Sequence, residues 1–342
     1  MNELRNKVGR LFVARPESLD PSIRWKSDLE LPEYALSSLN RRMRAFAREY
    51  PVGGVVLFGH NIQSPGQLRS FTAALKTLPG RPLVCIDEEG GRVSRIARNP
   101  AFDVPRFESC ARIAESDSAY SAARSIGHYL KEYGFDLDFA PLADVNTNPD
   151  NPVIGTRAFS SDPSRAAAMV SDFVRGLLDE HIQPCLKHFP GHGDTSQDTH
   201  SGFASISRGW DSLLSCGELQ PFLAGIDAGA KMVMVAHICA REVTGDSTPS
   251  SLSKTIIEDK LRSELGFDGV VITDALEMGA ITEEYSSAEA AVKAILAGAD
   301  MLLAPLDFRE AFDAVVDAVE RGIIPKSRID SSLARIQAFR QD

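Results

Sequence analysis

The chain has 342 residues, of which 43% are hydrophobic and 25% are charged, as in an average globular protein. Its 37 Lys and Arg residues against 47 Asp and Glu residues give a formal net charge of −10, which argues against nucleic acid or an anionic membrane as a partner. The length fits either one large α/β barrel or two smaller domains.

The cysteines and the first residues indicate the compartment. The five cysteines are odd in number, irregularly spaced and without a CxxC pair, which is typical of a reducing environment. The N-terminal Met-Asn-Glu-Leu-Arg has no apolar signal core, and no run approaches the ~20 apolar residues of a membrane span. We therefore expect a soluble, cytoplasmic protein.

Short apolar runs recur along the chain, and each is followed by a helical pattern. They are rich in Val, Ile and Leu without polar alternation, as expected of strands that are buried on both faces of a parallel sheet. The predicted strands are Val8–Ala14, Gly54–Phe58, Leu83–Ile86, Leu137–Leu142, Pro184–Leu186, Met232–Ala236, Val270–Thr273 and Met301–Ala304.

The helices between these strands carry start and stop signals. Ser64-Pro65 and Asp162-Pro163 each place a capping residue before a proline, which favours a helix start. Ser253 is predicted to open a helix that Gly266 ends, and the next helix runs from Ser287 to Ala297 before Gly298.

The alternation of eight strands with helices predicts an α/β protein with a single (β/α)8 TIM-type barrel, formed by residues 1–342 as one domain. The alternative is an open, doubly wound sheet. Such a sheet usually carries a phosphate-binding glycine turn after a strand. Gly90-Gly91 lacks the required GxGxxG spacing, so the barrel is favoured.

The stretch Lys187-His188-Phe189-Pro190-Gly191-His192-Gly193, followed by Asp198 and His200, is the most distinctive in the chain. It places Lys187 and His188 at the end of a predicted strand and the other two residues in a long loop. Loops longer than about 12–15 residues are uncommon unless they are functional or disordered. Imidazole and carboxylate groups perform proton transfer, so this stretch is a candidate active-site segment.

Other predicted strands also end in ionisable groups, and active sites of such barrels lie at these ends. These groups are Asp87, Glu88, Glu89, Arg92 and Arg95, then Asp144 and Arg157, then His237, and finally Asp274. Each has a simpler interpretation: Asp274 could cap a helix, His237 could be a satisfied core histidine, and Glu88 and Glu89 could be solvated. Together they exceed what packing requires.

Lys-His-Phe-Pro-Gly-His-Gly, then Asp-x-His, then a strand ending in Asp-x-Leu-x-Met, resembles the family 3 glycoside hydrolases, most closely the single-domain bacterial β-N-acetylhexosaminidases of cell-wall recycling. The resemblance extends over nearly the whole chain. It implies a barrel that releases terminal N-acetylglucosamine with retention of configuration, without cofactor or metal, acting as a monomer or weak homo-oligomer on a small carbohydrate substrate.

The resemblance also implies residue roles. Asp274 is the expected nucleophile, and His200 is the expected general acid/base, paired with Asp198. The expected sugar-binding residues are Asp87, Arg95, Arg157, Lys187 and His188. Two positions depart from the family pattern: Glu88 replaces the usual Gln, and Ala275 replaces a frequent second Asp. Glu88 is expected to add charge beside Asp87, which leaves the sugar preference open.

The chemistry agrees with these roles. Retaining hydrolysis requires a carboxylate nucleophile and a proton donor on opposite sides of the glycosidic bond. The donor is usually a carboxylic acid, but here the sequence offers an imidazole that a nearby carboxylate would orient and keep protonated.

Four alternatives remain open. A β-glucosidase and an N-acetylglucosaminide phosphorylase fit the same family, because a histidine repels phosphate less than a carboxylate does. A metal-dependent hydrolase would use His188, His192, Asp198 and His200 as zinc ligands, although no HExxH motif occurs. A non-catalytic sugar-binding barrel would not need Asp274, Asp198 and His200 together.

Overall fold

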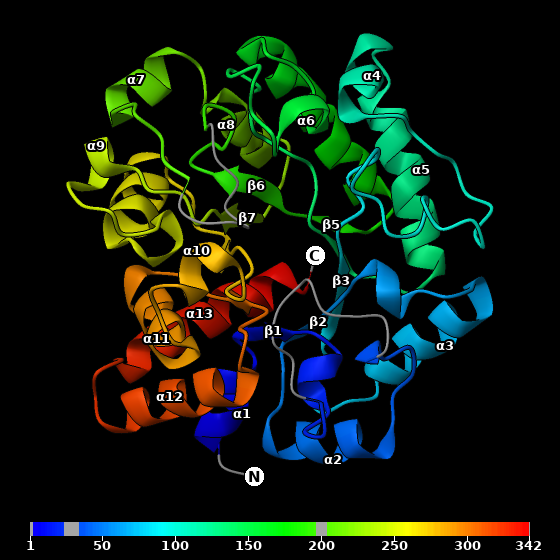
Figure 1. Ribbon diagram of the computed structural model, residues 1–342, viewed down its shortest axis with the longest axis vertical. Coiled ribbons are helices and arrows are strands. Elements are labelled where there is room, and N and C mark those ends of the chain that lie inside the picture. The colour runs from blue at the N-terminus through cyan, green and yellow to red at the C-terminus, as the bar shows by residue number, and fades with distance from the viewer. Residues whose placement is uncertain (1–2, 24–33, 196–203, 342) are drawn as a thin grey trace.

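The computed structural model describes residues 3–23, 34–195 and 204–341. Its strands gather in the middle of the molecule, and most of its helices surround them (Figure 1). The strands are β1 (Phe12–Ala14), β2 (Gly54–Leu57), β3 (Leu83–Ile86), β4 (Leu137–Asp138), β5 (Gln183–Pro184), β6 (Leu186–Phe189), β7 (Met232–Val235), β8 (Val270–Thr273) and β9 (Leu302–Leu303).

The helices alternate with these strands along most of the chain. They are α1 (Glu3–Gly9), α2 (Arg41–Glu49), α3 (Pro65–Leu75), α4 (Cys110–Glu115), α5 (Ala119–Glu132), α6 (Pro163–Asp179), α7 (Trp210–Ser215), α8 (Gln220–Asp227), α9 (Arg241–Thr244), α10 (Gly279–Thr282), α11 (Ser287–Ala297), α12 (Phe308–Glu320) and α13 (Lys326–Phe339). The helix predicted between Ser253 and Gly266 is a π-helix, η6 (Thr255–Glu264).

The cap predicted at Asp162 is present, and α11 begins at a cap that was not predicted. The side chain of Asp162 accepts a hydrogen bond from the backbone N–H of Arg165 at 2.7 Å, and Pro163 occupies the first turn of α6. Ser286 and Glu289 form a reciprocal capping box at the start of α11. Gly298 ends that helix with φ of 116°, a left-handed conformation that favours glycine.

The prediction of a single closed (β/α)8 barrel is wrong. The strands form two parallel sheets, a curled one of six strands in the order β5-β4-β3-β2-β1-β9 and a second of three strands in the order β6-β7-β8. Single bridges, Leu142 with Lys187 and Ile272 with Met301, lie where the two sheets meet. The barrel is not closed because the backbone pairing between strands is short at these edges.

At one edge, β4 and β5 are only two residues long, and the prolines at 141 and 184 have no N–H to donate to a ladder. The predicted strand Pro184–Leu186 is consequently divided between β5 and β6. At the other edge, only Leu302–Leu303 of the predicted Met301–Ala304 is a strand, and it pairs with β1.

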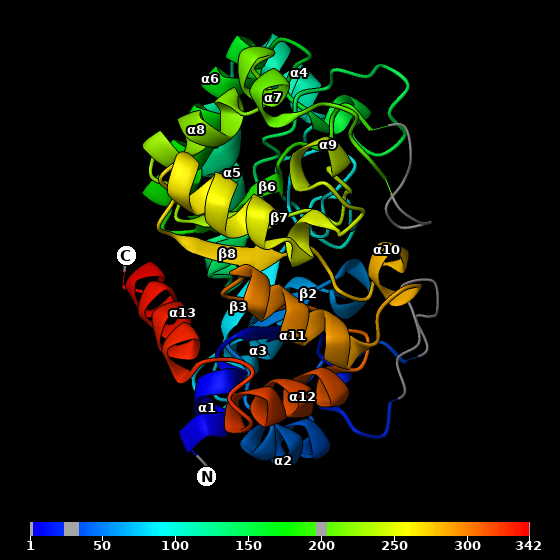
Figure 2. The same cartoon turned by 90° about the vertical axis from the view of Figure 1, so that its left-hand side faces the viewer.

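Side chains from both sheets and the surrounding helices form the core. The strands are buried along their length: Val55, Val84, Val233 and Val271 are 0% exposed. Figure 2 shows α9 and α10 on one side of the strands and α13 on the opposite side. The first of these sides is where the carboxyl ends of the parallel strands lie.

Helices α5 and α6 pack side by side, and Gly176 allows their close approach (Figure 1). A Cβ atom at Gly176 would lie 2.5 Å from the carbonyl oxygen of Tyr120 and 2.7 Å from the Cβ of Ala123. We expect Gly176→Ala to lower the free energy of unfolding by about 1–3 kcal/mol, because the added methyl overpacks this contact.

Denaturant unfolding measures this effect, and Gly66→Ala is the matched control. Gly66 lies in the first turn of α3, where no described atom would come within 4 Å of an added Cβ. This control should be neutral or slightly stabilising, since alanine favours helix over glycine. Equal stability of the two variants would contradict the packing interpretation.

Candidate active site

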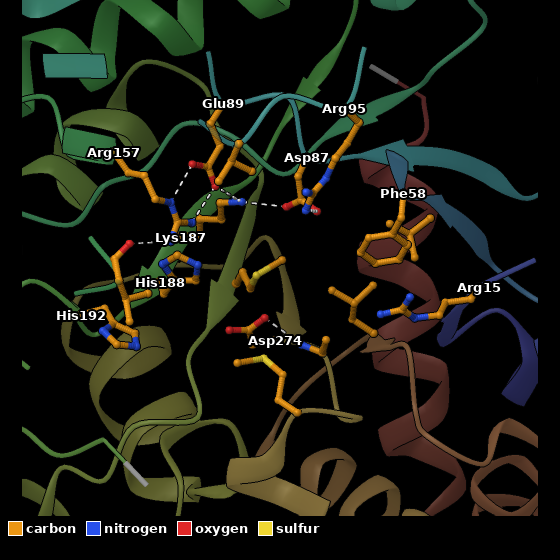
Figure 3. A pocket seen from close by; sticks show the side chains of 17 residues that line it. Arg15, Phe58, Asp87, Glu89, Arg95, Arg157, Lys187, His188, His192 and Asp274 are labelled. Atoms are coloured by element: carbon orange, nitrogen blue, oxygen red, sulfur yellow. Dashed lines mark hydrogen bonds and ion pairs between the residues drawn. The ribbon is translucent and has the colours of Figure 1, made fainter. Parts of the chain in front are cut away.

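A cavity of about 320 Å³ lies at the carboxyl ends of the strands. Figure 3 shows Asp87, Glu89, Arg157 and Lys187 on one side and Asp274 facing them across the space, with Arg15 apart from that group. The lining residues are Arg15, Val56, Phe58, Asp87, Glu89, Val93, Arg95, Val153, Arg157, Lys187, His188, His192, Met234, Asp274, Ala275, Met278 and Leu303.

Lys187 is the centre of the charged side. Its side chain is 3% exposed, and its ammonium lies 2.8 Å from Oδ1 of Asp87 and 2.6 Å from Oε1 of Glu89. Arg157 binds the same Glu89 in a bidentate pair, with Nε–Oε2 at 2.9 Å and Nη2–Oε1 at 2.7 Å. Arg95 lies 3.5 Å from Asp87. The four residues Asp87, Glu89, Arg157 and Lys187 are named the Lys187 cluster below.

These contacts fix the charges of the cluster. Burial alone would raise the pKa of Glu89, but Arg157 and Lys187 hold it well below its usual value. Burial also raises the pKa of Asp87, but Lys187 and Arg95 outweigh this effect and hold the pKa below its usual value. The two carboxylates in turn raise the pKa of Lys187 despite its burial. The cluster is therefore a fixed array of charged donors and acceptors at neutral pH.

A further buried carboxylate, Asp144, holds the two histidines of the cavity in place. Its Oδ2 lies 2.8 Å from Nδ1 of His188, and its Oδ1 accepts the backbone N–H of His192 at 2.7 Å. Burial opposes ionisation of Asp144, but His188 lowers the pKa of this carboxyl below its usual value. The ring of His192 contacts the hydroxyl of Thr195 at 2.8 Å. Asp144 thus fixes the ring of His188 and the backbone of His192, and Thr195 holds the ring of His192.

Asp274 follows β8 directly, and hydrogen bonds to the backbone fix both its main chain and its side chain. Its backbone N–H donates to the carbonyl of Val235, and its Oδ1 accepts the N–H of Ala275 at 2.8 Å. The next carbonyl, that of Ala275, lies 2.9 Å from Nε2 of His237, whose Nδ1 lies 2.7 Å from the hydroxyl of Ser251. His237 is fully buried and does not line the cavity, in agreement with the core interpretation.

The structure brings six of the predicted site residues to this one cavity: Asp87, Arg95, Arg157, Lys187, His188 and Asp274. The other two, Asp198 and His200, lie outside the described residues. Arg157 pairs with Glu89, and Asp162 caps α6.

The expectation for Glu88 is wrong. Its carboxylate points away from the cavity and accepts the backbone N–H groups of Arg95, Ile96 and Ala97 and the hydroxyl of Tyr129. Burial raises its pKa. Side chains alternate along an extended chain, so Asp87 and Glu89 share one face and Glu88 takes the other. Glu88 therefore adds no charge to the wall of the cavity.

Sequence reasoning missed several residues of the site. Glu89 and Glu88 are not solvated, with 2% and 0% exposure, and the alternation after β3 was the signal that distinguishes them. Asp144 appeared only as a strand-end group, and His192 only as a zinc ligand. Arg15 and Phe58 directly follow β1 and β2, but neither belongs to a recognisable sequence motif.

In the described ranges, no three His, Cys, Asp or Glu side chains are arranged to hold a metal ion. Two of the four residues in the zinc hypothesis, Asp198 and His200, lie outside those ranges, so that hypothesis stays untested.

Among the helices of the described ranges, none combines the length and the apolar character needed to cross a bilayer.

The lowered pKa of Glu89 predicts how acid affects stability. A carboxyl whose pKa falls on folding stabilises the protein fully above its usual value, 4.5, and loses this contribution as pH falls toward the lower folded value. We expect Glu89→Gln to be less stable than wild type at pH 7, with a difference that shrinks between pH 5 and pH 3. Urea unfolding at these pH values measures it, and a constant difference would contradict the assignment.

Comparison with known proteins adds to this geometry. The model of the glycosyl hydrolase family 3 N terminal domain matches residues 4–339. The chain is 33% identical to beta-hexosaminidase A of Pseudoalteromonas piscicida, covering 88% of this chain and 55% of that protein. It is 38% identical to a beta-hexosaminidase of Stenotrophomonas maltophilia, covering 78% of this chain and 80% of the relative.

A solved structure is similar along the whole chain. A family 3 beta-N-acetylglucosaminidase from Paenibacillus is 36% identical and superposes with a TM-score of 0.86, covering 100% of this chain and 62% of that one. The chain thus spans little more than half the length of some relatives that it matches. Since the family model covers almost every residue, the chain belongs to glycosyl hydrolase family 3 and contains its N-terminal domain.

Proposed function

We propose that the protein is a retaining exo-β-N-acetylglucosaminidase. One observation carries the proposal: the carboxylate of Asp274, at the end of β8, faces the Lys187 cluster across a cavity of sugar size. A nucleophile and a set of hydroxyl-binding groups in one cavity are what glycosyl transfer to the enzyme requires. The names of the hexosaminidase relatives support the choice of sugar.

The reaction has two steps. Asp274 attacks C1 of the sugar and forms a glycosyl ester, while the bond from C1 to the leaving oxygen breaks and that oxygen takes a proton from the general acid. Water then attacks C1 and gives a proton to the same residue, now acting as base, and Asp274 is released as a carboxylate. His200, partnered by Asp198, is the proposed acid/base on the evidence of the sequence motif alone.

The Lys187 cluster supplies the binding of the sugar. Sugar hydroxyls both donate and accept hydrogen bonds, and the cluster combines cationic donors with carboxylate acceptors. Because each charge already has an opposite partner, the cavity needs little rearrangement when the sugar enters. This preorganisation lowers the cost of placing C1 next to Asp274.

We extend the proposal to the biological context. The substrate is proposed to be a muropeptide or a related β-glycoside with a terminal N-acetylglucosamine. All five cysteines lie in the described part of the chain as free thiols, which supports a reducing compartment such as the cytoplasm.

The proposed reaction is tested with a panel of aryl glycosides, in which a β-N-acetylglucosaminide is compared with a β-glucoside at varied phosphate concentration. Faster turnover of the glucoside, or dependence on phosphate, would reject the proposal.

We expect Asp274→Ala to lower turnover of an aryl N-acetylglucosaminide by several orders of magnitude while the fold survives, because covalent catalysis divides one difficult step into two easier ones. A mechanism-based fluorosugar should label Asp274, as read by peptide mass spectrometry. Labelling of Asp87 or Glu277 in its place would exclude Asp274 as the nucleophile.

We expect His200→Ala to slow substrates with poor leaving groups most, because these substrates need protonation of the departing oxygen. Aryl substrates with acidic leaving groups should be spared at the first step. Asp198→Ala should have the same but weaker effect, since the ring remains. Rates across a series of leaving groups measure this, and equal losses across the series would rule out His200 as the acid.

A further inference from the structure

The wall of the cavity that adjoins Asp274 differs from the Lys187 cluster in chemistry. It consists mainly of apolar side chains, Val56, Phe58, Ala275, Met278 and Leu303, together with the cation Arg15. The guanidinium carbon of Arg95 also lies 5.7 Å from the ring centroid of Phe58, where this wall adjoins the Lys187 cluster. Figure 3 shows Arg15 and Phe58 side by side on this wall, away from His188 and His192. The proposed catalytic mechanism gives this wall no role.

Arg15 is fixed in place from three elements. It follows β1 directly and is 2% exposed. Its guanidinium carbon lies 3.9 Å from the ring centroid of Phe58, which follows β2. It also pairs with Glu277, which lies three residues after Asp274 and is 4% exposed. A stacked and paired guanidinium is held in one orientation.

The position of this wall decides which part of the sugar it meets. If C1 lies at Asp274, C2 is one bond from the reacting carbon, and the substituent on C2 is within reach of the residues that flank Asp274. Ala275, Glu277 and Met278 are those residues, and Arg15 is joined to them through Glu277. A C2 acetamido group has a carbonyl acceptor and a methyl group, whereas a C2 hydroxyl has no apolar part.

We propose that Arg15 is a specificity-determining residue that donates a hydrogen bond to the carbonyl of the C2 acetamido group, while the adjoining apolar wall packs on the methyl group. Glu277 and Phe58 are positioning residues for the guanidinium. This inference rests on the proposed function, which it deepens by assigning the recognition of the N-acetyl group. The charge of Arg15 is balanced by Glu277, so the wall suits a neutral amide better than an anion.

The experiment compares kcat/KM for an aryl N-acetyl-β-glucosaminide and an aryl β-glucoside in wild type and variants. Arg15→Met alone would leave the buried Glu277 without its cation and endanger folding, so the main variant is Arg15→Met with Glu277→Met. Replacement of both members of a buried pair by apolar residues is often tolerated. Arg262→Met is the control, because Arg262 is similarly buried (7% side-chain exposure) but lies before β8, paired with Asp300. Asp300 keeps Arg328 and Arg335 as cationic partners in this variant.

We expect the double variant to lose about tenfold to a hundredfold of its preference for the N-acetyl substrate, which is the effect of one charge-assisted hydrogen bond. Arg15→Lys should lose less, and the control should keep the wild-type preference. An unchanged preference in a folded double variant would overturn the role of Arg15. A wild-type enzyme that favours the glucoside would instead overturn the proposed function, and the two failures are therefore distinguishable.

Discussion

The buried ammonium of Lys187 is the interaction on which the rest of the site depends. Asp87 and Glu89 follow β3 in the six-stranded sheet, whereas Lys187 belongs to β6 in the three-stranded sheet. The ion pairs therefore join the two sheets next to the edge where their hydrogen-bonded ladder is interrupted. Loss of one partner from such a buried group is costly, because the remaining charges stay desolvated. The cluster thus fixes how the two sheets meet.

The same arrangement places the functional groups. The proposed nucleophile, Asp274, directly follows β8 of the three-stranded sheet, and Asp87 directly follows β3 of the six-stranded one. Their separation across the cavity is set by the contacts between the sheets. Lys187 contributes through its ion pair with Asp87, and Asp144 contributes by accepting the backbone N–H of His192. A sugar that bridges the two sheets would use a geometry that already exists without it.

Much of this could be predicted from the sequence, for physical reasons. Leu83–Ile86, Val270–Thr273 and Ser287–Ala297 have the predicted bounds because their apolar runs end at polar, capping or glycine residues. The opening between the sheets could not be predicted, since an apolar run does not reveal which backbone groups pair. Glu88 and Glu89 could not be distinguished, since side chains alternate only along an extended chain and the sequence does not show that the chain stays extended after β3. Arg15 and Phe58 reach the cavity only through the tertiary fold. The roles of Asp198 and His200 rest on the motif alone.

The central claim is that the Lys187 cluster and Asp274 bind one sugar between the two sheets. A crystal structure with bound N-acetylglucosamine tests this most directly. The account predicts sugar hydroxyl oxygens within about 3.2 Å of Asp87, Arg157 and Lys187, with C1 nearest to the carboxylate of Asp274. A sugar bound in this cavity with C1 turned away from Asp274, or bound only elsewhere on the protein, would contradict it.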